Sequence, residues 1–218
     1  MLALLCLSVV SQARPVPFAE VEKALDAARD AATRRAALVA SIENVSEVAG
    51  RPATTSRFEL SLEKAAFTIT GTDLVLGGQV VKGPVVETWN GRQFSTTGLP
   101  APFARPPADV TSRNQAMARS SLNLTPFSVD LLAGVDVRMA LGDAPATGTV
   151  EPLKDGTRLS WKSEREATVI ELGRDGVVKL ISVTFQTSEG ASTLRQTVTP
   201  KKREGKPAKE RPVHQVTP

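Results

Sequence analysis

The chain has few of the residues that carry most acid–base and metal chemistry. Its 218 residues include one cysteine, one histidine and no tyrosine. The histidine, His214, lies close to the C-terminal end, and the cysteine, Cys6, lies in the first apolar run. A Ser-His-Asp or Cys-His site needs a base beside its nucleophile, and a zinc site needs several Cys or His ligands. These arrangements are therefore excluded for the rest of the chain, and we expect neither an enzyme nor a cofactor.

Aromatic residues and surplus charge are also scarce. Phe, Trp and Tyr together make up 4% of the chain. The net charge of +4 comes from residues 200–218, which hold six basic and two acidic side chains and leave the remainder neutral. A surface without basic patches or stacking aromatics does not suit nucleic acid. We expect residues 200–218 to form a disordered basic tail, either simply solvated or in weak contact with the anionic lipid of a membrane surface or with nucleic acid.

Long hydrophobic runs are absent except at the start. The first 13 residues have no charged side chain, and their apolar run of about ten residues fits a secretory signal but is too short to span a bilayer. Ser11 and Ala13 supply the small residues that a signal peptidase requires. We therefore expect residues 1–13 to be a signal peptide that directs export. A buried N-terminal segment is the alternative.

Periodicity predicts one helix followed by many strands. Val21, Leu25, Ala28 and Ala32 form one apolar stripe, which predicts a helix over residues 18–33. The segment 36–48 fits a strand or a continuation of that helix. Alternating stretches then follow, separated by turn dipeptides such as Asn90-Gly91 and Asp175-Gly176. Successive strands with tight turns indicate an antiparallel meander, so the fold class is mainly β.

The hairpin over residues 167–186 shows how such a sheet divides its side chains. Alternation places an apolar set on one face, and Lys179 would share that face with Ile181. The other face is small or polar and would include Val178. Aspartate and glutamate side chains are expected on outward strand positions or in turns.

The middle of the chain interrupts the meander. Residues 99–107 are rich in proline, and residues 109–121 are compatible with a polar helix. Thr125-Pro126-Phe127 predicts the start of a short helix that ends at Gly134, with Phe127, Leu131 and Leu132 on one face. Such a segment is either a movable lid or merely a covering connection.

Three stretches carry a resemblance to a known family. They are VVETWNGRQFST (85–96), LTPFSVDLLAG (124–134) and IELGRDGVVKLISVTFQTSEGASTLRQTV (170–198). In this order they resemble the periplasmic carriers of outer-membrane lipoproteins, the LolA/LolB superfamily, over a domain of residues 14–199. The resemblance implies a curved antiparallel sheet forming an incomplete β-barrel. An N-terminal helix and short mid-chain helices would cover its concave face.

The resemblance also implies a function. A monomer of this kind would bind lipid or lipoprotein acyl chains in an apolar cavity. The same residues could instead be ordinary core, and the alternatives are a non-carrier envelope module that binds a protein partner or senses stress, and an enzyme of unrecognised type. The residues expected to line the cavity are Leu60, Leu62, Phe67, Trp89, Phe94, Phe127, Trp161, Ile170, Leu172, Ile181 and Phe185.

Overall fold

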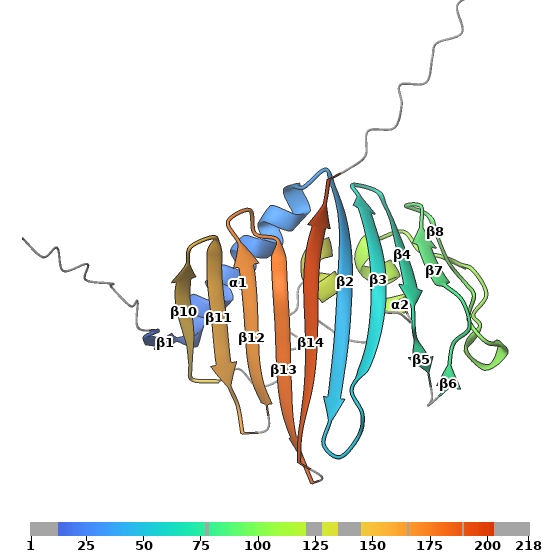
Figure 1. Cartoon of the computed structure of the whole chain (residues 1–218). Coiled ribbons are helices and arrows are strands. Elements are labelled where there is room, and N and C mark those ends of the chain that lie inside the picture. The colour runs from blue at the N-terminus through green and yellow to red at the C-terminus, as the bar shows by residue number, and fades with distance from the viewer. Residues whose placement is uncertain are drawn as a thin grey trace, which may run out of the picture.

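The structure is a computed structural model of the whole chain, shown in Figure 1. It describes residues 13–76, 79–120, 128–134, 145–164, 166–188 and 190–202. The expected signal segment up to residue 12, Phe127, and residues 203–218 of the expected tail lie outside the described residues.

One antiparallel sheet of twelve strands dominates the described chain. In spatial order its strands are β1 (Pro15–Pro17), β10 (Thr147–Leu153), β11 (Gly156–Lys162), β12 (Glu166–Gly173), β13 (Val178–Thr187), β14 (Gly190–Lys201), β2 (Ala37–Val48), β3 (Thr54–Glu63), β4 (Ala66–Thr72), β7 (Val85–Trp89), β8 (Gln93–Thr97) and β9 (Ala108–Asp109). A separate pair joins β5 (Val75–Leu76) to β6 (Gln79–Val80). The segment 36–48 is thus a strand and does not extend the helix.

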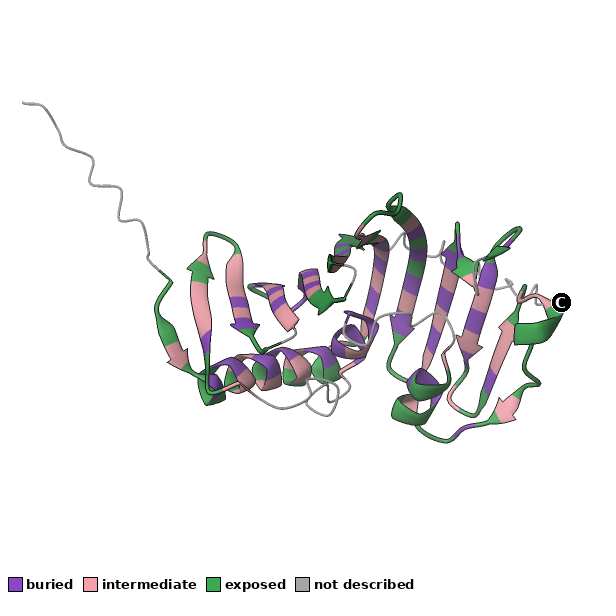
Figure 2. Cartoon of the chain, turned by 90° about the horizontal axis from the view of Figure 1, so that it is seen from below, coloured by how far each residue is buried: buried purple, intermediate pink, exposed green. Residues whose placement is uncertain are grey.

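The sheet is strongly curved and open, as Figure 2 shows from below. Its two halves meet where β14, late in the chain, pairs with β2, early in the chain. The edge strands β1 and β9 are short, and prolines lie within β1 and directly before β9. Proline removes a backbone donor and so discourages further strand addition at an edge. The predicted incomplete barrel is confirmed.

The helices of the described chain lie behind the sheet in Figure 1, on its concave side. They are α1 (Phe18–Arg34), α2 (Arg113–Arg119) and α3 (Ser128–Ala133), with a 3-10 turn at Ala101–Phe103. Val21, Leu25, Ala28 and Ala32 are buried as the apolar stripe predicted. In the part of the chain that the structure describes, we find no helix of the length and apolar character needed to cross a bilayer.

Helix α1 packs directly against a glycine of the sheet and a glycine of the β12–β13 turn. A Cβ atom at Gly148 of β10 would come 2.7 Å from Cγ2 of Val21, and one at Gly176 would come 2.9 Å from Cβ of Ala31. Gly176 also has a φ of 73°, which favours glycine. The rings of Phe18 and Trp161 meet edge to face with centroids 5.7 Å apart. These contacts fix α1 on strands β10–β13.

A side chain at Gly148 is therefore expected to push α1 away from β10. We predict that Gly148→Ala lowers the free energy of unfolding by about 1–2 kcal/mol through overpacking. Combining it with Val21→Ala removes the clashing methyl, so the double variant should lose less than the sum of the two single losses. Urea unfolding of the four proteins measures this coupling, and strictly additive losses would contradict the close packing.

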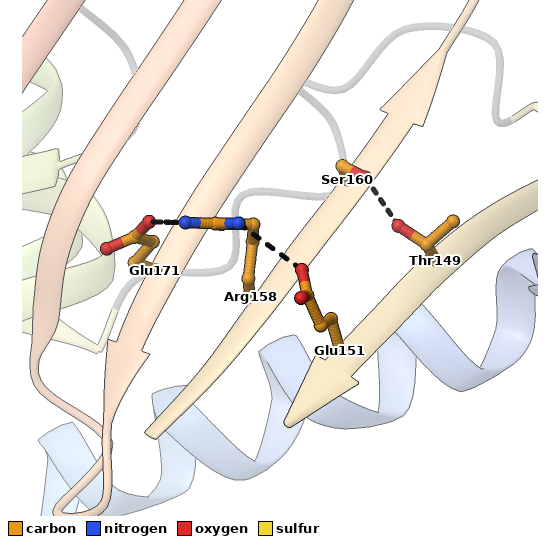
Figure 3. A network of polar contacts seen from close by, with 5 residues as sticks. All are labelled: Thr149, Glu151, Arg158, Ser160 and Glu171. Carbon is orange, nitrogen blue, oxygen red and sulfur yellow. Dashed lines mark hydrogen bonds and ion pairs between the residues drawn. The ribbon is translucent and has the colours of Figure 1, made fainter. Parts of the chain in front are cut away.

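The outer, convex face of the sheet is polar. Figure 3 shows Arg158 of β11 between Glu151 of β10 and Glu171 of β12, with Nη2 2.7 Å from Oε1 of Glu171. The hydrogen bond that Arg158 donates to the carboxylate of Glu171 is the main cause that raises the pKa of Arg158. Beside them the hydroxyls of Thr149 and Ser160 pair across the same strands. Solvent therefore covers this face, and the apolar side chains collect on the other.

A β-bulge corrects the predicted faces of the 167–186 hairpin. Glu171 lies opposite Leu180, but Leu172 lies opposite Val178, so Lys179 is left without a partner residue in β12. One extra residue reverses the alternation beyond it. Val178 is consequently buried and Lys179 is exposed, which is the reverse of the sequence prediction.

Candidate functional site

The strand register arranges the inner face in rows that run across the sheet. One row, here called the aromatic row, consists of Leu38, Leu62, Phe67, Trp89 and Phe94. All five side chains are buried, and the centroid of Phe67 lies 5.9 Å from that of Trp89 and 6.3 Å from that of Phe94. Four of the eleven residues expected to line a cavity therefore lie together, and Leu60 lies in the adjacent row.

Helix α2 covers the aromatic row and is held by polar contacts at both ends. Ser112 caps its first turn by accepting a hydrogen bond from the backbone N–H of Gln115. Ahead of the helix, Nε1 of Trp89 donates to the carbonyl of Val110 over 2.8 Å. After it, the hydroxyl of Ser120 donates to the carboxylate of Glu87.

Arg113 joins three separate elements. Its Nη2 donates to the carbonyls of Glu63 and Lys64 in the turn after β3, over 2.5 and 2.6 Å. Its Nη1 donates to the carbonyl of Ala133 at the end of α3, over 3.2 Å. Burial lowers the pKa of Arg113. One guanidinium thus connects α2, α3 and the β3–β4 turn.

Glu87 is the only ionisable side chain among the buried polar residues of the described chain. The expectation that acidic residues face outward or occupy turns is therefore wrong for Glu87. The physical reason is the hydroxyl of Ser120, which compensates part of the cost of burying a carboxylate. A signal was present in the sequence: Val85 and Trp89 flank Glu87 at strand spacing and place it on their own face.

The other predicted site residues lie in the C-terminal half of the sheet. Trp161, Ile170, Leu172 and Ile181 are buried on strands β11–β13, the half against which α1 packs. Phe185 is 39% exposed near the end of β13, so it is not part of the core. The structure therefore divides the predicted site into a set under α2 and a set on the α1 side.

The structure shows a very small void where the helices meet. It measures about 10 Å³, enough for about one water molecule, and Ala32, Leu38, Leu62, Arg113 and Leu132 contribute to its wall. Two larger hollows lie elsewhere. One of about 320 Å³ is lined by α1 and the β12–β13 turn, and one of about 330 Å³ lies on the outer face of β2, β3 and β14.

The described residues offer no group of three or more His, Cys, Asp or Glu side chains placed to hold a metal ion. What the inner face does offer is apolar area, two indole rings and a few isolated polar groups. Such a surface can bind hydrophobic material by excluding water from it.

Comparisons with protein-family models and with curated proteins find no match. Among solved structures, the chain is similar to a LolA superfamily protein from Nitrosomonas europaea, at 11% identity and a TM-score of 0.38, covering 87% of this chain and 94% of that one. It is also similar to a DUF1329 family protein from Desulfovibrio piger, at 7% identity and a TM-score of 0.28, covering 88% and 95%. The first of these two proteins carries the name of the superfamily that the sequence resembles.

Proposed function

We propose that the chain is an exported, periplasmic binding or carrier protein that holds lipid or lipoprotein acyl chains against the aromatic row. The observation that supports this most is the cover of that row. Helix α2, which lies at that row, has seven residues, a length at which a helix is not stable by itself. Helix α3 has six residues; it contacts α1 and β13 and is bonded to Arg113 of α2. Their position depends on side chains that reach into the sheet and on the polar contacts of Arg113 and Ser120. A cover of this kind can leave the sheet without unfolding it.

The free energy gained by burying an acyl chain is close to the free energy needed to displace the helices. Each buried methylene contributes about 0.8 kcal/mol, so about ten methylenes contribute about 8 kcal/mol. Exposing the buried side chains of Met117, Val129, Leu131 and Leu132 costs about 1.5–3 kcal/mol each. The two sums are similar in size. A near balance suits a carrier, which must release what it binds.

The two tryptophans provide a direct test. Both are buried on the inner face, Trp89 under α2 and Trp161 against Phe18 of α1. We predict that a short acyl amphiphile changes the fluorescence emission saturably, that Trp161→Phe keeps this change and that Trp89→Phe loses it. Native mass spectrometry of gently purified protein should also detect a co-purified amphiphile. Recovery of ligand-free protein alone, with no saturable emission change, would rule out the carrier function.

A packed interaction module is the second candidate. It is favoured by the void of only about 10 Å³ between the helices and the sheet. In that case the helices would be a permanent part of the core, and a protein partner would bind elsewhere, for example in the hollow beside α1. The amides of α2 would then exchange hydrogen as slowly as those of β2, whereas a movable cover predicts much faster exchange in α2.

A further inference from the structure

Three polar side chains lie next to one another on the inner face, on the central strands β14, β2 and β3. Gln196 of β14 is directly opposite Asn44 of β2, and Asn44 is directly opposite Ser56 of β3. They are 4%, 6% and 8% exposed, respectively. We call these three residues the polar row. Directly opposite residues on one face of a sheet have Cβ atoms about 4.5–5.5 Å apart, so their side chains form one continuous patch.

The polar row interrupts an otherwise apolar surface. In the adjacent row toward the helices lie Val198, Ile42 and Phe58, all buried. In the adjacent row on the other side, Ser46 is partly exposed and Thr54 is exposed. On β2 and β3 the polar row therefore lies at the boundary between the apolar surface and the more exposed end of the strands, whereas on β13 Val183, in the row beyond, is still buried.

Two of its acceptors have no partner in the described part of the chain. The hydroxyl of Ser56 donates to the carbonyl of Asp73 over 3.3 Å. Oδ1 of Asn44 and Oε1 of Gln196 are buried and accept no hydrogen bond from the residues that the structure describes. A buried group left in this state costs about 1–3 kcal/mol. Rotating a carboxamide by 180° exchanges its oxygen and its nitrogen, but the group still offers one donor group and one acceptor. Asn44 and Gln196 therefore suit a ligand that both donates and accepts hydrogen bonds.

The surroundings of Asn44 and Gln196 favour an uncharged ligand group over a charged one. Among the buried side chains of the described chain, only Glu87 is ionisable, and it lies on β7, three strands away from β2. Arg57 and Asp73 pair with each other at exposed positions. An ammonium, carboxylate or phosphate brought to Asn44 and Gln196 would find no opposite charge and would lose its hydration.

We infer that Asn44 and Gln196 bind the neutral hydrogen-bonding group of an amphiphile, a hydroxyl or an amide, whose acyl chain covers Ile42, Phe58 and Val198. This inference rests on the proposed function and specifies its ligand class: acyl glycerols or acyl amides are preferred to ionised fatty acids. The polar group would sit near the exposed end of the sheet, with the acyl chain directed toward the helices.

The test compares two probes of equal chain length, monolauroylglycerol and laurate, on the full chain at pH 8. We expect the wild-type protein to bind monolauroylglycerol at least tenfold more tightly than laurate. The double variant Asn44→Leu/Gln196→Met keeps the volume of both side chains and removes unsatisfied polar atoms, so it is expected to fold. It should lose the tenfold preference through weaker binding of monolauroylglycerol, with laurate binding unchanged. Ser46→Ala, on the same strand and face as Asn44, is the matched control and should retain the preference.

The outcomes separate the inference from the function. If the wild-type protein binds both probes and the double variant keeps the same preference, the polar row does not contact the ligand, and the inference fails while the carrier function stands. A tightly held water on Asn44 and Gln196 would give that result. If the wild-type protein binds neither probe, the proposed function and the inference fail together.

Discussion

Replacing Arg113 with alanine is expected to release helix α2 while the sheet stays folded. The substitution removes the donor from three carbonyls, those of Glu63, Lys64 and Ala133. Hydrogen bonds from charged groups contribute about 1.5–3 kcal/mol each, but Arg113 is only partly buried. We therefore expect a total loss of about 2–3 kcal/mol, or a fall in Tm of about 5–10 °C. Hydrogen exchange in α2 should accelerate by about ten- to a hundredfold.

Two further variants make this result specific. Arg113→Lys should fall between the wild-type protein and Arg113→Ala, because a single ammonium group cannot reach three carbonyls in a fixed geometry. Arg119→Ala changes an exposed arginine of the same helix and should leave both Tm and exchange close to wild type. If α2 exchanges no faster in Arg113→Ala than in Arg119→Ala, the helix is held by its apolar contacts and is not a movable cover. If it does exchange faster, acyl probes should also bind more tightly, since less free energy is needed to displace the helix.

Much of the fold could be predicted from the sequence because the relevant signals are local. The stripe of Val21, Leu25, Ala28 and Ala32 fixed both the existence and the buried face of α1. The dipeptides Asn90-Gly91 and Asp175-Gly176 lie in turns where both glycines have positive φ, and they mark hairpins at the predicted places. Strand alternation then identified most of the inner face.

Features that depend on distant contacts could not be predicted in this way. The bulge that exposes Lys179 depends on how β12 and β13 pair, and neither strand shows it alone. The burial of Glu87 depends on Ser120, which is 33 residues later in the chain. The polar row needs the pairing of β14 with β2, so that Gln196 and Asn44 meet although they are far apart in sequence.

The candidate site, too, could be predicted from the sequence only in part. Hydrophobicity selects residues for burial but does not reveal which element covers them. Trp89 and Trp161 were equivalent candidates in the sequence. In the structure Trp89 bonds to the loop before a short helix, whereas Trp161 packs on the longest helix of the described chain. We interpret the first environment as separable and the second as permanent core.

Ile170→Ala tests that interpretation in the half of the sheet against which α1 packs. Ile170 is fully buried and lies directly opposite Leu159 on one side and Ile181 on the other, so its truncation leaves a cavity between fixed neighbours. The expected loss in the free energy of unfolding is about 3–4 kcal/mol, with a fall in Tm of about 10 °C. Val169→Ala, on the outer face of the same strand, should cost less than about 1 kcal/mol.

The decisive comparison is between stability and binding. If the half beside α1 is permanent core, Ile170→Ala lowers Tm but leaves the affinity of the folded protein for monolauroylglycerol within about twofold of wild type, because the acyl chain contacts β14, β2 and β3 and does not reach β12. Truncation at Leu60, in the row beside the aromatic row, should instead weaken both stability and binding. Should Ile170→Ala abolish binding while Tm stays near that of Val169→Ala, the cavity would lie beneath α1, and the assignment of the two halves would have to be reversed.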